Sequence, residues 1–225
     1  MCFSATASFT VAATLAPVGI YCVHRARREA PRSLLFAAFP LVFALQQAIE
    51  GVVWMHLAEH MQQPGTAAYG FLFFSHFFWL WWVPLAAWYL EPADAKKTLC
   101  GVITALGLCY GLSLYAPLLL MDEWVRVAVV DHSISYQVGL IYEGLLRREW
   151  VHGLYALCVI SPLLLQSDFH VRIFGGVVLL SMVIASQEFT QAYISVWCFF
   201  AAVASAYLLF MLPKHGKAAV YGTAN

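Results

Sequence analysis

Three polar side chains interrupt the long apolar segment at residues 33–58, and they are the first groups in the chain that could do chemistry. They are Gln46, Gln47 and Glu50. At 100° per residue of a helix they form one polar stripe, with Trp54 one turn beyond Glu50. A carboxylate in hydrocarbon costs at least about 2.5–3.5 kcal/mol, so it normally faces a protein interior or a water-filled cavity. The stripe therefore predicts a binding site, a catalytic site or a buried polar contact between helices.

A histidine in the next apolar segment lies at the same predicted depth as Glu50. His76 is about eight residues from the outer end of segment 68–90, and Glu50 is about eight residues, roughly 12 Å, from the outer end of its own segment. Consecutive spans run in opposite directions, so the two side chains should meet. We expect a hydrogen bond between Glu50 and His76, in which the carboxylate fixes the tautomer of the imidazole.

Three interpretations of these groups stay open: a pocket for a small or lipid-like ligand, a membrane-embedded hydrolase or transferase, and a structural clamp. In the enzyme, Glu50 would be the base and His76 the acid or a metal ligand, because zinc accepts oxygen and nitrogen donors. The candidate cofactors are a divalent metal, a lipid or a quinone, the last stacked on a flat ring such as Trp79. The candidate ligand-binding residues are Gln46, Gln47, Glu50, Trp54, His76, Trp79 and Glu188. The candidate metal ligands are Glu50, His76, His152 and Glu188.

The composition is that of an integral membrane protein. The 225 residues are 62% hydrophobic and 11% charged, with a mean hydropathy of +0.75, whereas soluble domains are about 45–50% apolar and about 25% charged. Twelve basic residues balance twelve acidic ones. Because nucleic-acid binding calls for a basic patch, that class of partner is excluded and the lipid bilayer is the expected surrounding.

Apolar segments of helical length predict an all-α fold with seven transmembrane helices. No second domain is visible, so we expect a single transmembrane domain over residues 1–225. The predicted spans are Ser4–Val23, Ser33–Ala58, Ala68–Leu90, Thr98–Leu120, Trp150–Leu165, Val171–Gln191 and Ile194–Leu212.

The basic residues predict the orientation of the bundle. Cytoplasmic connections carry an excess of Lys and Arg, and an extracytoplasmic N-terminus with a cytoplasmic C-terminus places nine of the twelve basic residues inside. Only Arg126, Arg147 and Arg148 then lie outside. The nine inner residues are Arg25, Arg27, Arg28, Arg32, Lys96, Lys97, Arg172, Lys214 and Lys217.

One connection, residues 121–149, is longer than a span-to-span link requires, and we expect it to form a small lid on the outer face. Alternating residues in VRVAVV and ISYQV predict two short strands around a turn at Asp131, His132 and Ser133. The following GLIYEGLLRREW, residues 139–150, is typical of a helix lying in the membrane interface. A plain connecting loop is the alternative.

Three segments of the chain are characteristic as sequences: MCFSATASF at the start, QQAIEGVVW in the second span and ISVWCFFAA in the seventh. They resemble the signature segments of a bacterial family of multi-span membrane proteins without an assigned activity. The resemblance covers nearly the whole chain. It implies a multi-pass protein of the bacterial inner membrane, and it implies no particular chemistry.

Overall fold

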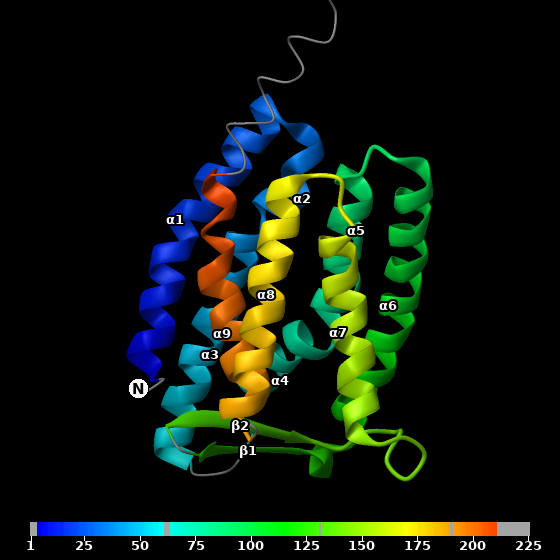
Figure 1. Ribbon diagram of the computed structural model, residues 1–225. Coiled ribbons are helices and arrows are strands. Elements are labelled where there is room, and N and C mark those ends of the chain that lie inside the picture. Colours follow the sequence, from blue (N-terminus) through cyan, green and yellow to red (C-terminus); the bar gives the residue numbers. More distant parts are fainter. Residues whose placement is uncertain (1–3, 61–63, 131, 190, 211–225) are drawn as a thin grey trace, which may run out of the picture.

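The computed structural model describes residues 4–60, 64–130, 132–189 and 191–210. Within these ranges the chain is mainly helical, and the long helices run side by side with a two-stranded sheet across one end (Figure 1). The α-helices are α1 (Ala5–Glu29), α2 (Leu34–Ala37), α3 (Phe39–His60), α4 (Thr66–Phe73), α5 (Trp79–Leu90), α6 (Asp94–Leu120), α7 (Arg148–Leu164), α8 (Phe169–Glu188) and α9 (Tyr193–Ser205).

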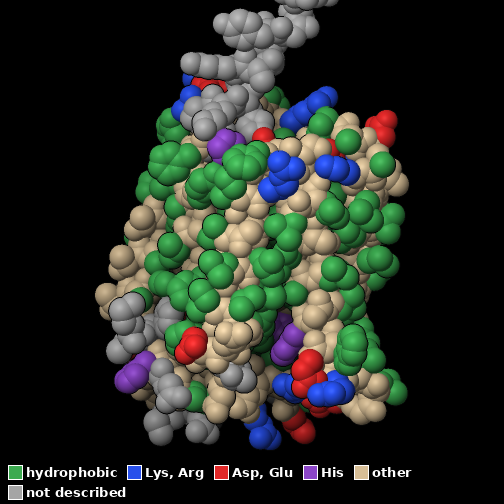
Figure 2. All heavy atoms as spheres, in the orientation of Figure 1, with side chains coloured by type: hydrophobic (Ala, Val, Ile, Leu, Met, Phe, Trp, Pro, Cys, Tyr) green, Lys and Arg blue, Asp and Glu red, His purple; other side chains and the backbone are tan. Residues whose placement is uncertain are grey.

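The part of the chain that the structure describes contains six helical segments long and apolar enough to cross a membrane. Hydrophobic side chains cover the middle of the face seen in Figure 2, and most charged side chains gather at its two ends. Length and composition therefore support six of the seven predicted spans. The six segments are Ala5–Glu29, Pro31–Glu59, Thr66–Leu90, Asp94–Leu120, Phe169–Glu188 and Tyr193–Phe210.

The remaining predicted span, Trp150–Leu165, corresponds to α7. This helix has 17 residues and is about 26 Å long at 1.5 Å per residue. That length falls at the lower end of the range for a transmembrane helix.

The predicted hairpin is confirmed. Strands β1 (Val125–Val130) and β2 (Ser133–Val138) pair antiparallel, with Val130 opposite Ser133 at the turn. His132 in this turn has a φ of 61°, while Asp131 lies outside the described residues, as do Lys214 and Lys217. Figure 1 shows the strands lying across the end of the bundle toward which the N-terminus of α1 also points. We call this unit the hairpin.

The interfacial helix predicted for residues 139–150 is not formed. Turns follow one another from residue 141 to residue 145, and α7 begins only at Arg148. Gly144 has a φ of +86°, which lies outside the helical region of backbone dihedral angles. A left-handed glycine therefore ends any helix at this position.

A π-helical turn, η2 (Phe74–Phe78), separates α4 from α5 inside one apolar span. The N–H of Trp79 donates to the carbonyl oxygen of Phe74, five residues earlier, which fits one more residue into the turn than an α-helix holds. Ser75 and His76 lie in this turn, and both are buried.

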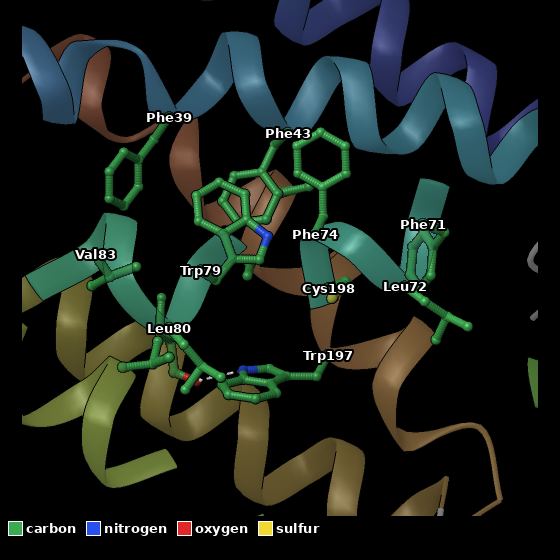
Figure 3. Close-up of a cluster of buried hydrophobic side chains, with 14 of the residues drawn as sticks. Phe39, Phe43, Phe71, Leu72, Phe74, Trp79, Leu80, Val83, Trp197 and Cys198 are labelled. Atoms are coloured by element: carbon green, nitrogen blue, oxygen red, sulfur yellow. Dashed lines mark hydrogen bonds between the residues drawn. The ribbon is translucent and has the colours of Figure 1, made fainter. Parts of the chain in front are cut away.

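Aromatic side chains fill the core between α3 and α5 (Figure 3). The rings of Phe43 and Trp79 are stacked with centroids 4.1 Å apart, and Phe39 packs on the same indole at 5.5 Å. Trp79 is only 4% exposed. It is thus a core residue, and it also lines a small apolar cavity.

A buried carboxylate joins two loops at the end of the bundle opposite the hairpin. Glu91, which follows α5, accepts hydrogen bonds from the backbone N–H of Ala93 (3.1 Å) and from both the N–H and the hydroxyl of Ser167 (2.8 and 2.7 Å). Burial alone raises the pKa of Glu91, but these hydrogen bonds outweigh it and hold the pKa below its usual value. The charged carboxylate therefore fastens the α5–α6 loop to the α7–α8 loop.

Candidate functional site

The polar stripe of α3 is completely enclosed by neighbouring helices. One oxygen of Glu50, Oε1, accepts a hydrogen bond from the hydroxyl of Ser195 on α9 at 2.5 Å, and Oε2 accepts one from Nε2 of Gln47 at 3.0 Å. Oε1 of Gln46 accepts from the indole N–H of Trp79 on α5 at 2.8 Å. All five residues are at most 4% exposed. We call this group the polar clamp, because it ties α3 to both α5 and α9.

The predicted hydrogen bond between Glu50 and His76 is not formed. Both oxygens of Glu50 have the partners given above, and Nδ1 of His76 lies 2.9 Å from the hydroxyl of Ser75 instead. Equal depth on two antiparallel helices does not set the direction in which each side chain points around its helix axis. The partner of Glu50 on another helix is Ser195 of α9.

A cavity of about 330 Å³ lies beneath the hairpin. Its walls come from β2, η2, α6, α7 and α9. Ser75 and His76 contribute polar groups from the buried side, whereas Arg148 and His152 contribute them from the first turns of α7. We call it the hairpin cavity. Its other lining residues are Leu114, Ser135, Tyr136, Gln137, Val138, Leu140, Val151, Tyr155, Gln191, Tyr193, Ile194, Trp197 and Cys198.

A second, smaller cavity of about 40 Å³ adjoins the first and is apolar. The two share Tyr155, Trp197 and Cys198 as lining residues. Several side chains around the smaller cavity, among them Phe43 and Val83, are labelled in Figure 3. Together the two cavities offer a compartment with several polar groups in its wall next to one that is apolar.

Tyr136 stands between the hairpin cavity and the polar clamp. Its ring stacks on Phe71 with centroids 4.6 Å apart, and it is 6% exposed. Burial raises the pKa of this phenol well above its usual value, and the nearby Glu50 carboxylate raises it further. The phenol oxygen has no hydrogen-bond partner among the described residues. It is therefore a buried O–H donor at the cavity wall that lacks an acceptor.

The residues predicted as one site thus fall into separate places. Of the predicted residues, His76 and His152 line the hairpin cavity, while Gln46, Gln47, Glu50 and Trp79 form the clamp with Ser195 and do not line it. Trp54 is half-buried on α3, and Glu188 is exposed at the end of α8.

The predicted metal-ligand set of Glu50, His76, His152 and Glu188 is not assembled. Within the described ranges, no three His, Cys, Asp or Glu side chains lie close enough together to hold a metal ion. The reason is geometric, since Glu50 is enclosed in the clamp and Glu188 lies at an exposed helix end.

Several cavity residues were missed by the sequence reasoning. Ser75 had a signal, because it is adjacent to His76 in the otherwise apolar run FLFFSHFFWL. Arg148 and Gln137 had none, because their place in the wall depends on how the hairpin folds back over the helices. Ser195 likewise meets Glu50 only through the packing of α9 on α3.

Comparison with protein families matches residues 1–222 to one family model, described as "Family of unknown function (DUF6629)". No curated protein and no solved structure matches the chain.

The clamp leads to a prediction about stability. Glu50→Leu leaves the Gln47 and Ser195 donors without an acceptor, which costs about 1–3 kcal/mol for each, so the melting temperature of the purified protein should fall clearly. Glu50→Gln keeps the volume and one oxygen acceptor and should lower it less. Glu188→Gln, at an exposed position, is the matched control and should leave it unchanged. A normal melting temperature for Glu50→Leu together with loss of a cavity ligand would contradict the clamp.

Proposed function

Because the chain belongs to this family of unknown function, we propose its role from the hairpin cavity: the protein binds a small or lipid-like ligand there, in a non-enzymatic binding or accessory role. The observation that carries the proposal is the pairing of a 330 Å³ compartment, which has several polar groups in a largely apolar wall, with an adjoining apolar one. Small-molecule sites are commonly concave, mostly apolar and about 300–1,000 Å³ in size, with a few polar groups that set the orientation.

The proposal includes a placement in the membrane. We propose seven spans, with α7 as the fifth, in a single transmembrane domain over residues 1–225 that carries residues 121–149 as an extracytoplasmic insertion. The N-terminus is extracytoplasmic and the C-terminus cytoplasmic, in the inner membrane of a bacterium. Its support is the distribution of basic residues in the sequence and the position of the hairpin at the end toward which the N-terminus of α1 points.

The binding role predicts a molecule that purifies with the protein. Organic extraction and mass spectrometry should detect it at near one equivalent, and Leu114→Trp should reduce it several-fold, because Leu114 is a buried wall residue that a larger ring would push into the cavity. Leu106→Trp, on the same helix but exposed, should leave it unchanged. Equal amounts in the two variants, both with a normal melting temperature, would count against a ligand in this cavity.

The orientation predicts which sites are accessible in intact cells. Val129→Cys, exposed on β1, should react with a membrane-impermeant maleimide, while Thr98→Cys, exposed in the second turn of α6, should react only after the inner membrane is permeabilised. The unsubstituted chain gives the background of its own cysteines. The reverse labelling pattern would show that the orientation is wrong.

A second candidate function is supported by one contact in the cavity wall. The hydroxyl of Ser75 lies 2.9 Å from Nδ1 of His76, which is the distance at which a histidine can act as general base for a serine nucleophile. This contact would make the protein a membrane-embedded hydrolase or transferase acting on a lipid-like substrate, with Ser75 and His76 in place of the Glu50 and His76 pair.

The enzyme is distinguished from the binding protein by covalent labelling. A fluorophosphonate probe should label the folded enzyme at Ser75, and labelling should disappear in Ser75→Ala but persist in Ser113→Ala, whose hydroxyl lies on α6 and does not line the cavity. Failure to label the folded protein at Ser75 would remove this candidate.

A further inference from the structure

We infer that the ligand of the hairpin cavity is a single-chain amphiphile with an anionic head group, bound by donors from Arg148, His76 and Tyr136. The inference rests on the proposed binding function and adds to it the chemical class of the ligand. It starts from the chemistry of the wall: the lining residues include one guanidinium and two imidazoles, and none of them is an Asp or a Glu.

Arg148 is held in place by contacts that leave part of its donor set available. Its Nη2 donates to the carbonyl oxygen of Val138 at 2.9 Å and to Oε1 of Glu143 at 2.5 Å. Nε and Nη1 have no hydrogen-bond partner among the described residues. A guanidinium is planar and presents its donors in a rigid fork that matches a carboxylate or a phosphate. The two hydrogen bonds of Nη2 therefore also fix the directions of Nε and Nη1.

His76 offers a second donor from the buried side of the cavity. The Ser75 hydroxyl has two acceptors in reach, Nδ1 of His76 at 2.9 Å and the carbonyl oxygen of Leu72 at 3.5 Å, so Nδ1 is the nearer one. A neutral imidazole that accepts at Nδ1 carries its proton at Nε2. His76 then donates through Nε2, and an oxygen anion supplies the acceptor.

Tyr136 completes the set and is the clearest sign of a missing acceptor. Tyr136 is a lining residue and its phenol oxygen is buried, yet no described residue accepts its proton. Buried polar groups are normally hydrogen-bonded, and leaving one unpaired is costly. His76 on η2 and Arg148 on α7 thus line one compartment, the Tyr136 hydroxyl on β2 is buried in its wall, and none of the lining residues is an Asp or a Glu.

The neighbouring acidic groups do not reverse this preference. Glu50 is shut off in the clamp, where both of its oxygens accept hydrogen bonds, and it does not line the cavity. Glu143 pairs with Arg148 from outside the lining. Glu143 offsets part of the positive charge of Arg148. The preference among head groups therefore depends on the positions of the hydrogen-bond donors as well as on net charge.

The size of the compartments limits the apolar part of the ligand. The hairpin cavity of about 330 Å³ adjoins a small apolar space of about 40 Å³, with which it shares Tyr155 and Trp197 as lining residues. This space is too small for a two-chain phospholipid. A single acyl chain lying against the aromatic wall is the occupant that fits.

The test compares three probes that share one chain and differ in head group: decanoate, decanol and decylamine. Binding is measured from the rise in melting temperature of the protein in nanodiscs of zwitterionic lipid, since a ligand that binds only the folded state raises it with concentration. We expect decanoate to bind at least about tenfold more tightly than the other two. In Leu114→Trp the cavity is filled, so any rise in melting temperature that remains in this variant comes from partition of the probes into the bilayer and is subtracted.

Two variants assign the preference to the named donors. Tyr136→Phe removes the unpaired hydroxyl and breaks no hydrogen bond, so the melting temperature without probe should not fall, while decanoate binding should weaken several-fold. Arg148→Gln should abolish the preference for decanoate over decanol, and Arg126→Gln, on β1 of the hairpin and outside the lining, should keep it. If all three probes bind equally and Leu114→Trp abolishes this binding, the anionic head group is overturned and the binding function is kept. Absence of any cavity-dependent binding would overturn both.

Discussion

Enclosing a carboxylate within an apolar bundle requires hydrogen-bond donors that approach it from more than one helix, and Glu50 imposes this requirement on the whole structure. Gln47 supplies one donor from the same helix, but the second comes from Ser195 at the start of α9, far away in the sequence. Gln46 extends the contact to Trp79 of α5. The positions of α5 and α9 against α3 are therefore specified by polar contacts as well as by packing, because any other arrangement leaves a charge or its donors unpaired.

The same constraint explains why the candidate site lies where it does. With Glu50 satisfied by its neighbours, the polar side chains that line the larger cavity are those under the hairpin. The π-helical turn directs Ser75 and His76 toward that space, α7 contributes Arg148 and His152, and β2 closes it with Tyr136. The protein therefore separates two kinds of polar burial, one that fastens helices together and one that faces a cavity.

The sequence predicted the helices and the hairpin well, because apolar length and strand alternation are local properties. It predicted that Glu50 and His76 are buried but not their partners, since the direction around a helix axis depends on which neighbour packs there. The π-helical turn has no simple pattern in FLFFSHFFWL and shifts every later side chain of its span. Gly144 shows the opposite case: its left-handed backbone ended a helix that the apolar spacing of residues 139–150 had indicated.

The π-helical turn also has a consequence for how this span tolerates changes in length. A π-turn holds one residue more than the α-helical turn it replaces, so deleting one residue between Phe73 and Trp79 would restore a regular helix without breaking the chain or shortening its apolar run. The same deletion would remove the one residue that the turn accommodates, so the two halves of the span would keep their present directions and Trp79 would still reach Gln46. The change would fall on the turn itself, which holds Ser75 and His76. A relative shorter by one residue here would keep the bundle and the clamp and lose the cavity wall that η2 provides, which makes the length of this turn a marker for the site.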